Sequence, residues 1–119
     1  MAGAQVVPIF YKSTEAELKT HLSQINGVLF PGGGMELNIK NTFTKNADII
    51  LNYAKQQNDA GKVFPIWATC LGHELISYLT CGYDSKVLGA VHDQGAVVNT
   101  LKFLSKNGDV LTNWTTSNF

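Results

Sequence analysis

Short apolar runs that alternate with amphipathic stretches are the feature that most constrains how this chain folds. Three runs have the length of strands, at residues 5–10 (QVVPIF), 28–30 (VLF) and 63–69 (VFPIWAT). The last is nearly all apolar, as the strands of a parallel sheet covered on both faces tend to be. Strands that alternate with helices predict an α/β fold. We expect a layered arrangement in which helices flank a parallel sheet.

Three helices are expected between and after these runs. The first begins at a capping box, in which the Thr14 hydroxyl accepts from the third helical amide and Glu17 reaches back to the Thr14 amide. The second ends near Gly61, where a left-handed residue is typical. The third covers residues 71–79 and stops before Gly82. The first two present apolar faces at helical spacing, formed by Leu18, His21, Leu22 and Ile25, and by Ala47, Ile50, Leu51 and Ala54.

Other segments are expected to depart from this pattern. Pro8 makes the first run an edge strand or a strand end, because proline lacks an amide hydrogen. Residues 35–44 show no clear period, which predicts a loop or a frayed turn. Near the C-terminus, residues 102–105 and 110–114 flank a KNGD turn. Asn-Gly between apolar runs is a strong hairpin signal, so we expect an antiparallel hairpin there.

Composition limits the classes of protein. The 119 residues are 45% hydrophobic and 15% charged, which indicates one small folded domain. Nine basic and nine acidic residues leave no net charge, so neither nucleic acid nor an anionic membrane is an expected partner. No apolar run approaches a membrane span, and residues 1–5 lack a basic signal-peptide start. The cysteines, Cys70 and Cys81, form neither a disulfide framework nor a zinc pair.

The sharpest motif is residues 67–72 (WATCLG), where a predicted strand runs directly into a helix with Cys70 at the corner. This is the pattern of a nucleophile elbow. Ala68 and Gly72 must be small where the helix passes close to the strand. The thiol then sits at a helix N-terminus, whose dipole favours a thiolate, and the Leu71 amide is placed to donate to an oxyanion. The alternative is that Cys70 is simply a small buried apolar residue.

A second motif, residues 30–34 (FPGGG), follows the preceding strand. In a parallel sheet this loop and Cys70 lie at the same carboxyl edge, where sites in such sheets form. One of its amides is a candidate second oxyanion donor. The alternatives are a plain flexible turn or a phosphate cradle, although no P-loop or dinucleotide fingerprint is present.

A cysteine nucleophile usually works with a histidine base. His73 lies three residues past Cys70 but points along the helix, and His21 matches an apolar helix face, as a core histidine would. His92 lies in a loop-like stretch with no geometric link to Cys70. Glu74 is a candidate for orienting a partner or binding an ammonium group, or is a solvated helix residue. No ligand spacing indicates a metal site.

Two segments in order, residues 25–33 (INGVLFPGG) and 64–74 (FPIWATCLGHE), resemble the gamma-glutamyl hydrolase family. That family cleaves folate polyglutamates and belongs to the class I glutamine amidotransferase-like superfamily. Residues 2–9 (AGAQVVPI) are also similar to the region of its second strand. The resemblance extends over roughly residues 2–80, which makes residues 1–119 a single partial domain of this type. It implies a three-layer, flavodoxin-like fold, a parallel sheet with flanking helices, that is incomplete in this chain.

The resemblance implies specific roles. Cys70 is similar to the family's nucleophile, and the amides of Gly33 and Leu71 are similar to its oxyanion hole. The implied reaction is hydrolysis of a γ-glutamyl amide bond through a thioester, without a cofactor or metal, on a small-molecule substrate. The family acts in vacuoles or lysosomes or is secreted, whereas a chain that starts at Met1 is expected in the cytoplasm. The candidates for substrate binding are Gly32, His73 and Glu74.

Departures from the family pattern set further expectations. The chain begins after the family's first strand and helix, and it lacks the downstream Trp-His-Pro-Glu-like motif that carries the catalytic histidine. We therefore expect impaired turnover. An open sheet edge predicts marginal stability or self-association. Two alternatives remain: another cysteine hydrolase of the same superfamily, or a degenerate domain without catalysis.

Overall fold

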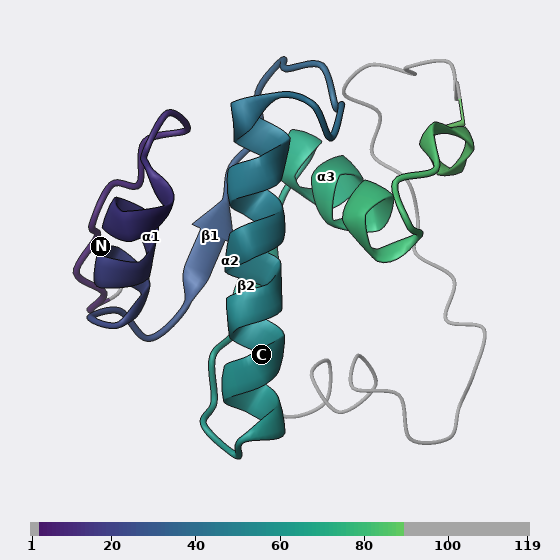
Figure 1. Ribbon diagram of the computed structural model, residues 1–119. Coiled ribbons are helices and arrows are strands. Elements are labelled where there is room, and N and C mark those ends of the chain that lie inside the picture. The colour runs from purple at the N-terminus through teal and green to yellow at the C-terminus, as the bar shows by residue number, and fades with distance from the viewer. Residues whose placement is uncertain (1–2, 90–119) are drawn as a thin grey trace.

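A two-stranded parallel sheet organises the part of the chain that the computed structural model describes, residues 3–89. Helix α2 connects the two strands, so the three elements form a βαβ unit (Figure 1). The elements in chain order are α1 (Glu15–Leu22), β1 (Val28–Phe30), α2 (Thr42–Asp59), β2 (Ile66–Ala68), α3 (Leu71–Thr80) and the 3-10 turn η1 (Ser85–Val87). The strand register pairs Val28 with Ile66, Leu29 with Trp67, and Phe30 with Ala68. The expected α/β class and all three helices are confirmed. Strands also form in the predicted runs 28–30 and 63–69, the second of them only over Ile66–Ala68.

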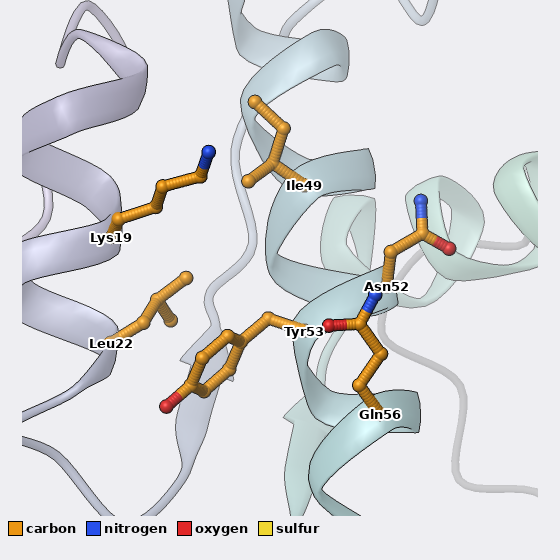
Figure 2. A pocket seen from close by; sticks show the side chains of 6 residues that line it. All are labelled: Lys19, Leu22, Ile49, Asn52, Tyr53 and Gln56. Carbon is orange, nitrogen blue, oxygen red and sulfur yellow. The ribbon is translucent and has the colours of Figure 1, made fainter.

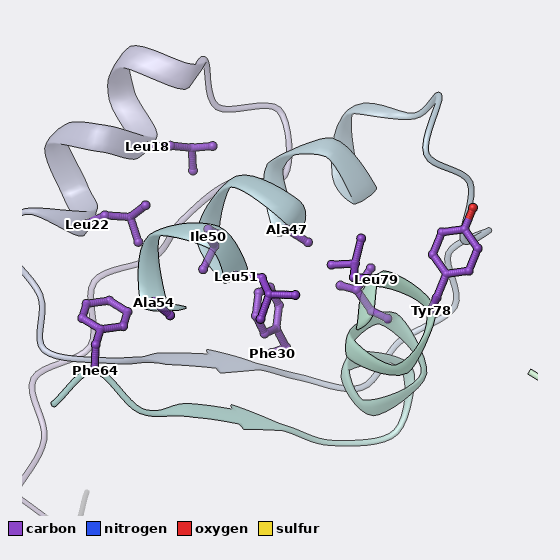
Figure 3. Close-up of a cluster of buried hydrophobic side chains, with 11 residues drawn as sticks. Leu18, Leu22, Phe30, Ala47, Ile50, Leu51, Ala54, Phe64, Tyr78 and Leu79 are labelled. Carbon is purple, nitrogen blue, oxygen red and sulfur yellow. The ribbon is translucent and has the colours of Figure 1, made fainter. Parts of the chain in front are cut away.

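The three helices lie on one side of the sheet and enclose the core with it (Figure 3). Leu18, Leu22 and Leu75 are essentially inaccessible to solvent, so α1 and α3 both contribute fully buried side chains. Helix α2 runs between them and supplies a continuous apolar stripe. The buried core cluster consists of Leu18, Leu22, Phe30, Ala47, Ile50, Leu51, Ala54, Phe64, Leu75, Tyr78 and Leu79.

The opposite side of the sheet has no helix over it within residues 3–89, where the structure shows two layers instead of the expected three. Leu29 and Trp67, which are paired across the strands, are 63% and 57% exposed on that side. Strands of three residues also leave both sheet edges short. The hairpin expected at residues 102–114 lies outside the described residues.

Local signals explain where the first helices begin. The capping box of α1 is complete: Glu17 N donates to Thr14 Oγ1, and Thr14 N donates to Glu17 Oε2 at 2.7 Å. The Thr14 amide thereby lowers the pKa of the Glu17 carboxyl. Helix α2 begins earlier than the sequence indicated, because the Asn41 carboxamide accepts from Thr44 N and caps it. The end of the expected 35–44 loop is therefore helical.

The strand expected at residues 5–10 is wrong, because no strand forms there in the structure. Pro8 has no amide hydrogen to donate to a neighbouring strand. The segment is instead fixed just beyond its end by Asn46 of α2. The Asn46 carboxamide donates to the carbonyl oxygens of Tyr11 (3.0 Å) and Ser13 (2.8 Å), which holds the chain in a turn before α1.

A second asparagine of α2 fixes the approach to β2. Asn58 Nδ2 donates to the carbonyl oxygen of Phe64 at 3.0 Å, and Asn58 Oδ1 accepts from Phe64 N at 2.9 Å. The side chain thus replaces a strand partner for Phe64, whose ring packs edge-on against Tyr53 of α2. Gly61, between them in sequence, has φ +77°, which confirms the left-handed helix end.

Replacing Asn58 with alanine removes both hydrogen bonds to Phe64 and leaves its backbone groups without partners. We expect Asn58→Ala to lower the free energy of unfolding by about 1–3 kcal/mol. Urea unfolding followed by far-ultraviolet circular dichroism measures this loss. Asn52→Ala, at an exposed position of the same helix, is the matched control. Equal unfolding midpoints for the two variants would contradict the assigned role of Asn58.

Candidate active site at Cys70

Cys70 occupies a strained corner between β2 and α3. Its backbone has φ 52° and ψ −118°, a positive-φ conformation that residues other than glycine rarely adopt. Such strain costs of order 1–3 kcal/mol and persists only where the surrounding structure imposes it. The thiol is exposed at this corner and forms no disulfide. The structure therefore has the elbow conformation that the sequence predicted, and Cys70 is not the buried apolar residue of the alternative interpretation.

The corner is imposed by contacts with the end of the neighbouring strand. Thr69 N donates to the carbonyl oxygen of Phe30 at 3.0 Å, and Gly72 N donates to Thr69 O at 2.9 Å. Gly72 lies so close to Phe30 that a Cβ there would clash with the Phe30 carbonyl oxygen and come within 2.7 Å of Phe30 Cβ. Gly72 is therefore required to be small, as expected, but against β1 and not against its own strand.

The glycine-rich loop after β1 passes over the thiol. A Cβ built on Gly32 would lie 3.2 Å from Cys70 Cβ and 3.6 Å from Cys70 Sγ. The next residue, Gly33, lies over the Leu71 side chain, with 3.6 Å from its built Cβ to Leu71 Cδ2. Both motifs follow the carboxyl ends of adjacent parallel strands. The structure thus brings together the two motifs, although they are separated by more than thirty residues.

His73 and Glu74 lie on the first turn of α3 and are exposed. Glu74 N donates to Cys70 O at 3.1 Å as part of the helix, and neither side chain hydrogen-bonds with Cys70 among the described residues. His21 is half-buried on α1, with its Nδ1 enclosed and unpartnered in the part of the chain described. His92 lies outside that part. The described residues therefore bring no histidine base to the thiol.

One contact next to Cys70 was not predicted from the sequence. Trp67 Nε1 donates to Thr69 Oγ1 at 3.2 Å, which joins the exposed ring on the strand to the residue before Cys70. The sequence did contain a signal for this contact, because residues two apart in a strand, such as 67 and 69, lie on the same side of the sheet. The contact fixes the Trp67 ring along the strand toward the elbow.

Two hollows among the described residues lie away from Cys70. One, of about 210 Å³, lies between α1 and α2 (Figure 2). The other, of about 380 Å³, lies near the start of β2. Neither of them has Cys70, Gly32 or Gly33 in its lining. The first is lined by Lys19, Leu22, Ile49, Asn52, Tyr53 and Gln56.

Two other kinds of feature are not found in residues 3–89. No three His, Cys, Asp or Glu side chains gather there to hold a metal ion. None of the helices described is both long and apolar enough to cross a membrane.

Comparison with known proteins gives the chain its family. Gamma-glutamyl hydrolase B of Dictyostelium discoideum is 40% identical over 84 residues, which is 70% of this chain and 24% of that protein. The human gamma-glutamyl hydrolase is 43% identical over 81 residues, or 68% of this chain and 25% of the human protein. This chain is a partial member of the gamma-glutamyl hydrolase family. A probable gamma-glutamyl hydrolase of Arabidopsis thaliana is 36% identical over 77 residues. The chain spans about a quarter of the length of these gamma-glutamyl hydrolases. No family model matches it.

Substitution at Gly72 tests the contact that imposes the elbow. Alanine normally stabilises a helix relative to glycine, by up to about 1 kcal/mol. At Gly72 the added methyl group meets the backbone of Phe30, so we expect Gly72→Ala to destabilise the fold by about 1–3 kcal/mol. Gly34→Ala is the control, since a Cβ there meets nothing within 4 Å. Thermal unfolding of both variants measures the difference, and a stabilised Gly72→Ala variant would contradict the contact.

The strain at Cys70 predicts an ordering of variants. Glycine adopts the observed positive φ without a steric penalty, whereas alanine has a Cβ and pays the same penalty as cysteine. We expect Cys70→Gly to unfold at higher urea concentration than Cys70→Ala, with a difference of about 1–3 kcal/mol in the free energy of unfolding. Cys81→Gly and Cys81→Ala form the matched pair, because Cys81 has φ −89° and needs no left-handed conformation. The opposite order at position 70 would show that the corner is unstrained.

Proposed function

We propose that this chain carries the nucleophile and oxyanion-binding half of a γ-glutamyl peptide hydrolase of the folate polyglutamate type, with Cys70 as the attacking residue. The observation that carries the proposal is the strained, exposed thiol beneath the Gly32 backbone at the carboxyl edge of two parallel strands. This is the edge where ligands bind in open parallel sheets. The hydrolase names of the relatives support the same reaction class.

The proposed chemistry has two steps. Cys70 Sγ, as thiolate, attacks the γ-carbonyl carbon of the substrate, and the C–N bond breaks as the departing amine takes up a proton. The product is a γ-glutamyl thioester on Cys70. A water molecule then attacks the thioester carbon, which releases the γ-carboxyl group and returns the thiol. Neither step requires a cofactor.

The backbone around Cys70 supplies the stabilisation in this proposal. Leu71 begins α3, and the first amides of a helix have no partner within the helix. Its N–H is thus available to the oxyanion that forms during attack, together with the N–H of Gly33 in the loop above. Gly32 has no side chain to block the approach to Sγ. His73 and Glu74, exposed on the first turn of α3, are the proposed contacts for the substrate's charged groups.

A general base or acid contributes about 10²–10⁴ in rate. Since the described residues place no histidine beside Cys70, the proposal includes slow turnover. Acylation by a substrate with a good leaving group needs the least help from an acid. A site without a histidine beside Cys70 is therefore expected to form the thioester more readily than it completes the full reaction.

Incubation with γ-glutamyl-p-nitroanilide tests the proposal. We expect one γ-glutamyl group per chain on Cys70, identified by peptide mass spectrometry, with p-nitroaniline release that slows after the first turnover. Cys81→Ala, which removes the other exposed cysteine, keeps this result, whereas Cys70→Ala abolishes it. A folded wild-type chain that stays unmodified, or acylation that persists in Cys70→Ala, would overturn the assignment. Glutamine tested beside a folate polyglutamate separates this function from that of a glutaminase.

A further inference from the structure

Asn41 joins the loop that passes over Cys70 to helix α2, and it uses both ends of its carboxamide to do so. Its Oδ1 accepts from Thr44 N at 2.7 Å, which caps α2. Its Nδ2 donates to the carbonyl oxygen of Glu36 at 2.6 Å, and we call this second bond the loop tether. Glu36 lies in the loop that leads from β1 to α2 (Figure 1), so one side chain holds the loop and the helix start together.

The part of the loop nearest the thiol has few other attachments. Residues 31–36 are all exposed, and in the described part of the chain the loop tether is the one hydrogen bond that reaches them. Three consecutive glycines, residues 32–34, give this segment more conformational freedom to lose than other residues would. Beyond Glu36, the half-buried Leu37 packs against the core. The loop tether is therefore the fixed point that lies nearest to the glycines on the α2 side.

A fixed point matters here because an oxyanion donor acts best when it is already in place. Preorganised donors stabilise the charge that develops in a transition state and need no reorganisation at the moment of reaction. Given the proposed function, on which this inference rests, the N–H of Gly33 is such a donor, and it stands three residues before Glu36. We infer that Asn41 is a positioning residue that keeps the Gly33 amide in place through the loop tether.

The capping and tethering roles of Asn41 can be separated, since aspartate and serine are about as good as asparagine at the N-cap of a helix. Asn41→Asp keeps an oxygen that accepts from Thr44 N, but its carboxylate has no hydrogen to donate to the Glu36 carbonyl oxygen. Asn41→Ser also keeps a capping oxygen, and its side chain ends one bond short of the amide nitrogen. Both variants remove the loop tether and keep the cap, and only the first adds a charge.

Asn38→Asp is the matched control, because it makes the same chemical change in the same loop. Asn38 Oδ1 accepts from Lys40 N at 2.9 Å, which an aspartate oxygen can also do. The Asn38 amide nitrogen donates no hydrogen bond among the described residues. The control therefore shares any effect of added negative charge on an anionic substrate and leaves the loop tether intact.

Two reactions of Cys70, measured in a Cys81→Ala chain, test the role of Asn41. Acylation by γ-glutamyl-p-nitroanilide passes through an oxyanion, whereas alkylation by iodoacetamide displaces iodide from a CH₂ group and forms none. We expect both Asn41 variants to slow acylation about three- to tenfold, as the loss of one hydrogen bond would, and to leave the alkylation rate unchanged. Asn38→Asp is expected to change neither rate.

The outcomes distinguish the positioning role from the function on which it rests. A Cys81→Ala chain that is never acylated overturns the proposed function. Asn41 variants that are acylated at the parent rate, or that lose acylation and alkylation equally, overturn the positioning role alone. A loss of acylation in Asn38→Asp as large as that in Asn41→Asp does the same, because charge would then explain both.

Amide hydrogen exchange measures the loop tether without any substrate. The peptide that contains residues 32–36 is expected to exchange faster in both Asn41 variants than in Asn38→Asp, while peptides from α2 keep the parent rate. Equal exchange of the loop in all three variants overturns the positioning role. Faster exchange along α2 as well would show that the variants act through the cap, and it overturns the role equally.

Discussion

The carbonyl oxygen of Phe30 stands where strand β1, the Cys70 corner and helix α3 meet. It accepts the hydrogen bond of Thr69 N and lies against Gly72, so one backbone group sets both the end of β2 and the closeness of α3. Because α3 begins immediately after Cys70, this contact also decides where the thiol points. The core beneath it, through Phe30 and Leu75, holds the strand and the helix in that position.

The candidate site follows from this contact and from the parallel order of the strands. Two adjacent parallel strands end at the same edge, so the loop after β1 and the corner after β2 meet although they are distant in sequence. The meeting places Gly32 over Cys70 Sγ. A strained backbone at Cys70 is stabilised by neighbours on both sides, which is the usual condition under which strain persists at functional positions.

Signals confined to one element were readable from the sequence. The capping box at Thr14, the apolar stripe of α2 and the strand–cysteine–helix transition each depend on residues a few positions apart, and each was predicted correctly. The conformation of residues 5–10 was not predicted, because an apolar run alone does not show whether a neighbouring strand will pair with it. The turn that follows this run is held by Asn46, more than thirty residues away in sequence. The early start of α2 was missed because one capping side chain, Asn41, outweighs a weak helical pattern.

The hydrogen bond from Trp67 to Thr69 links the exposed side of the sheet to the residue next to Cys70. The exposed indole ring lies on the side of the sheet that none of the described helices covers, while its acceptor is the residue that precedes Cys70. A substitution at Trp67 therefore also removes the donor to Thr69 Oγ1, one residue before the corner that carries the sulfur. Two positions on one side of a three-residue strand and its exit are thus joined by their side chains as well as by the backbone.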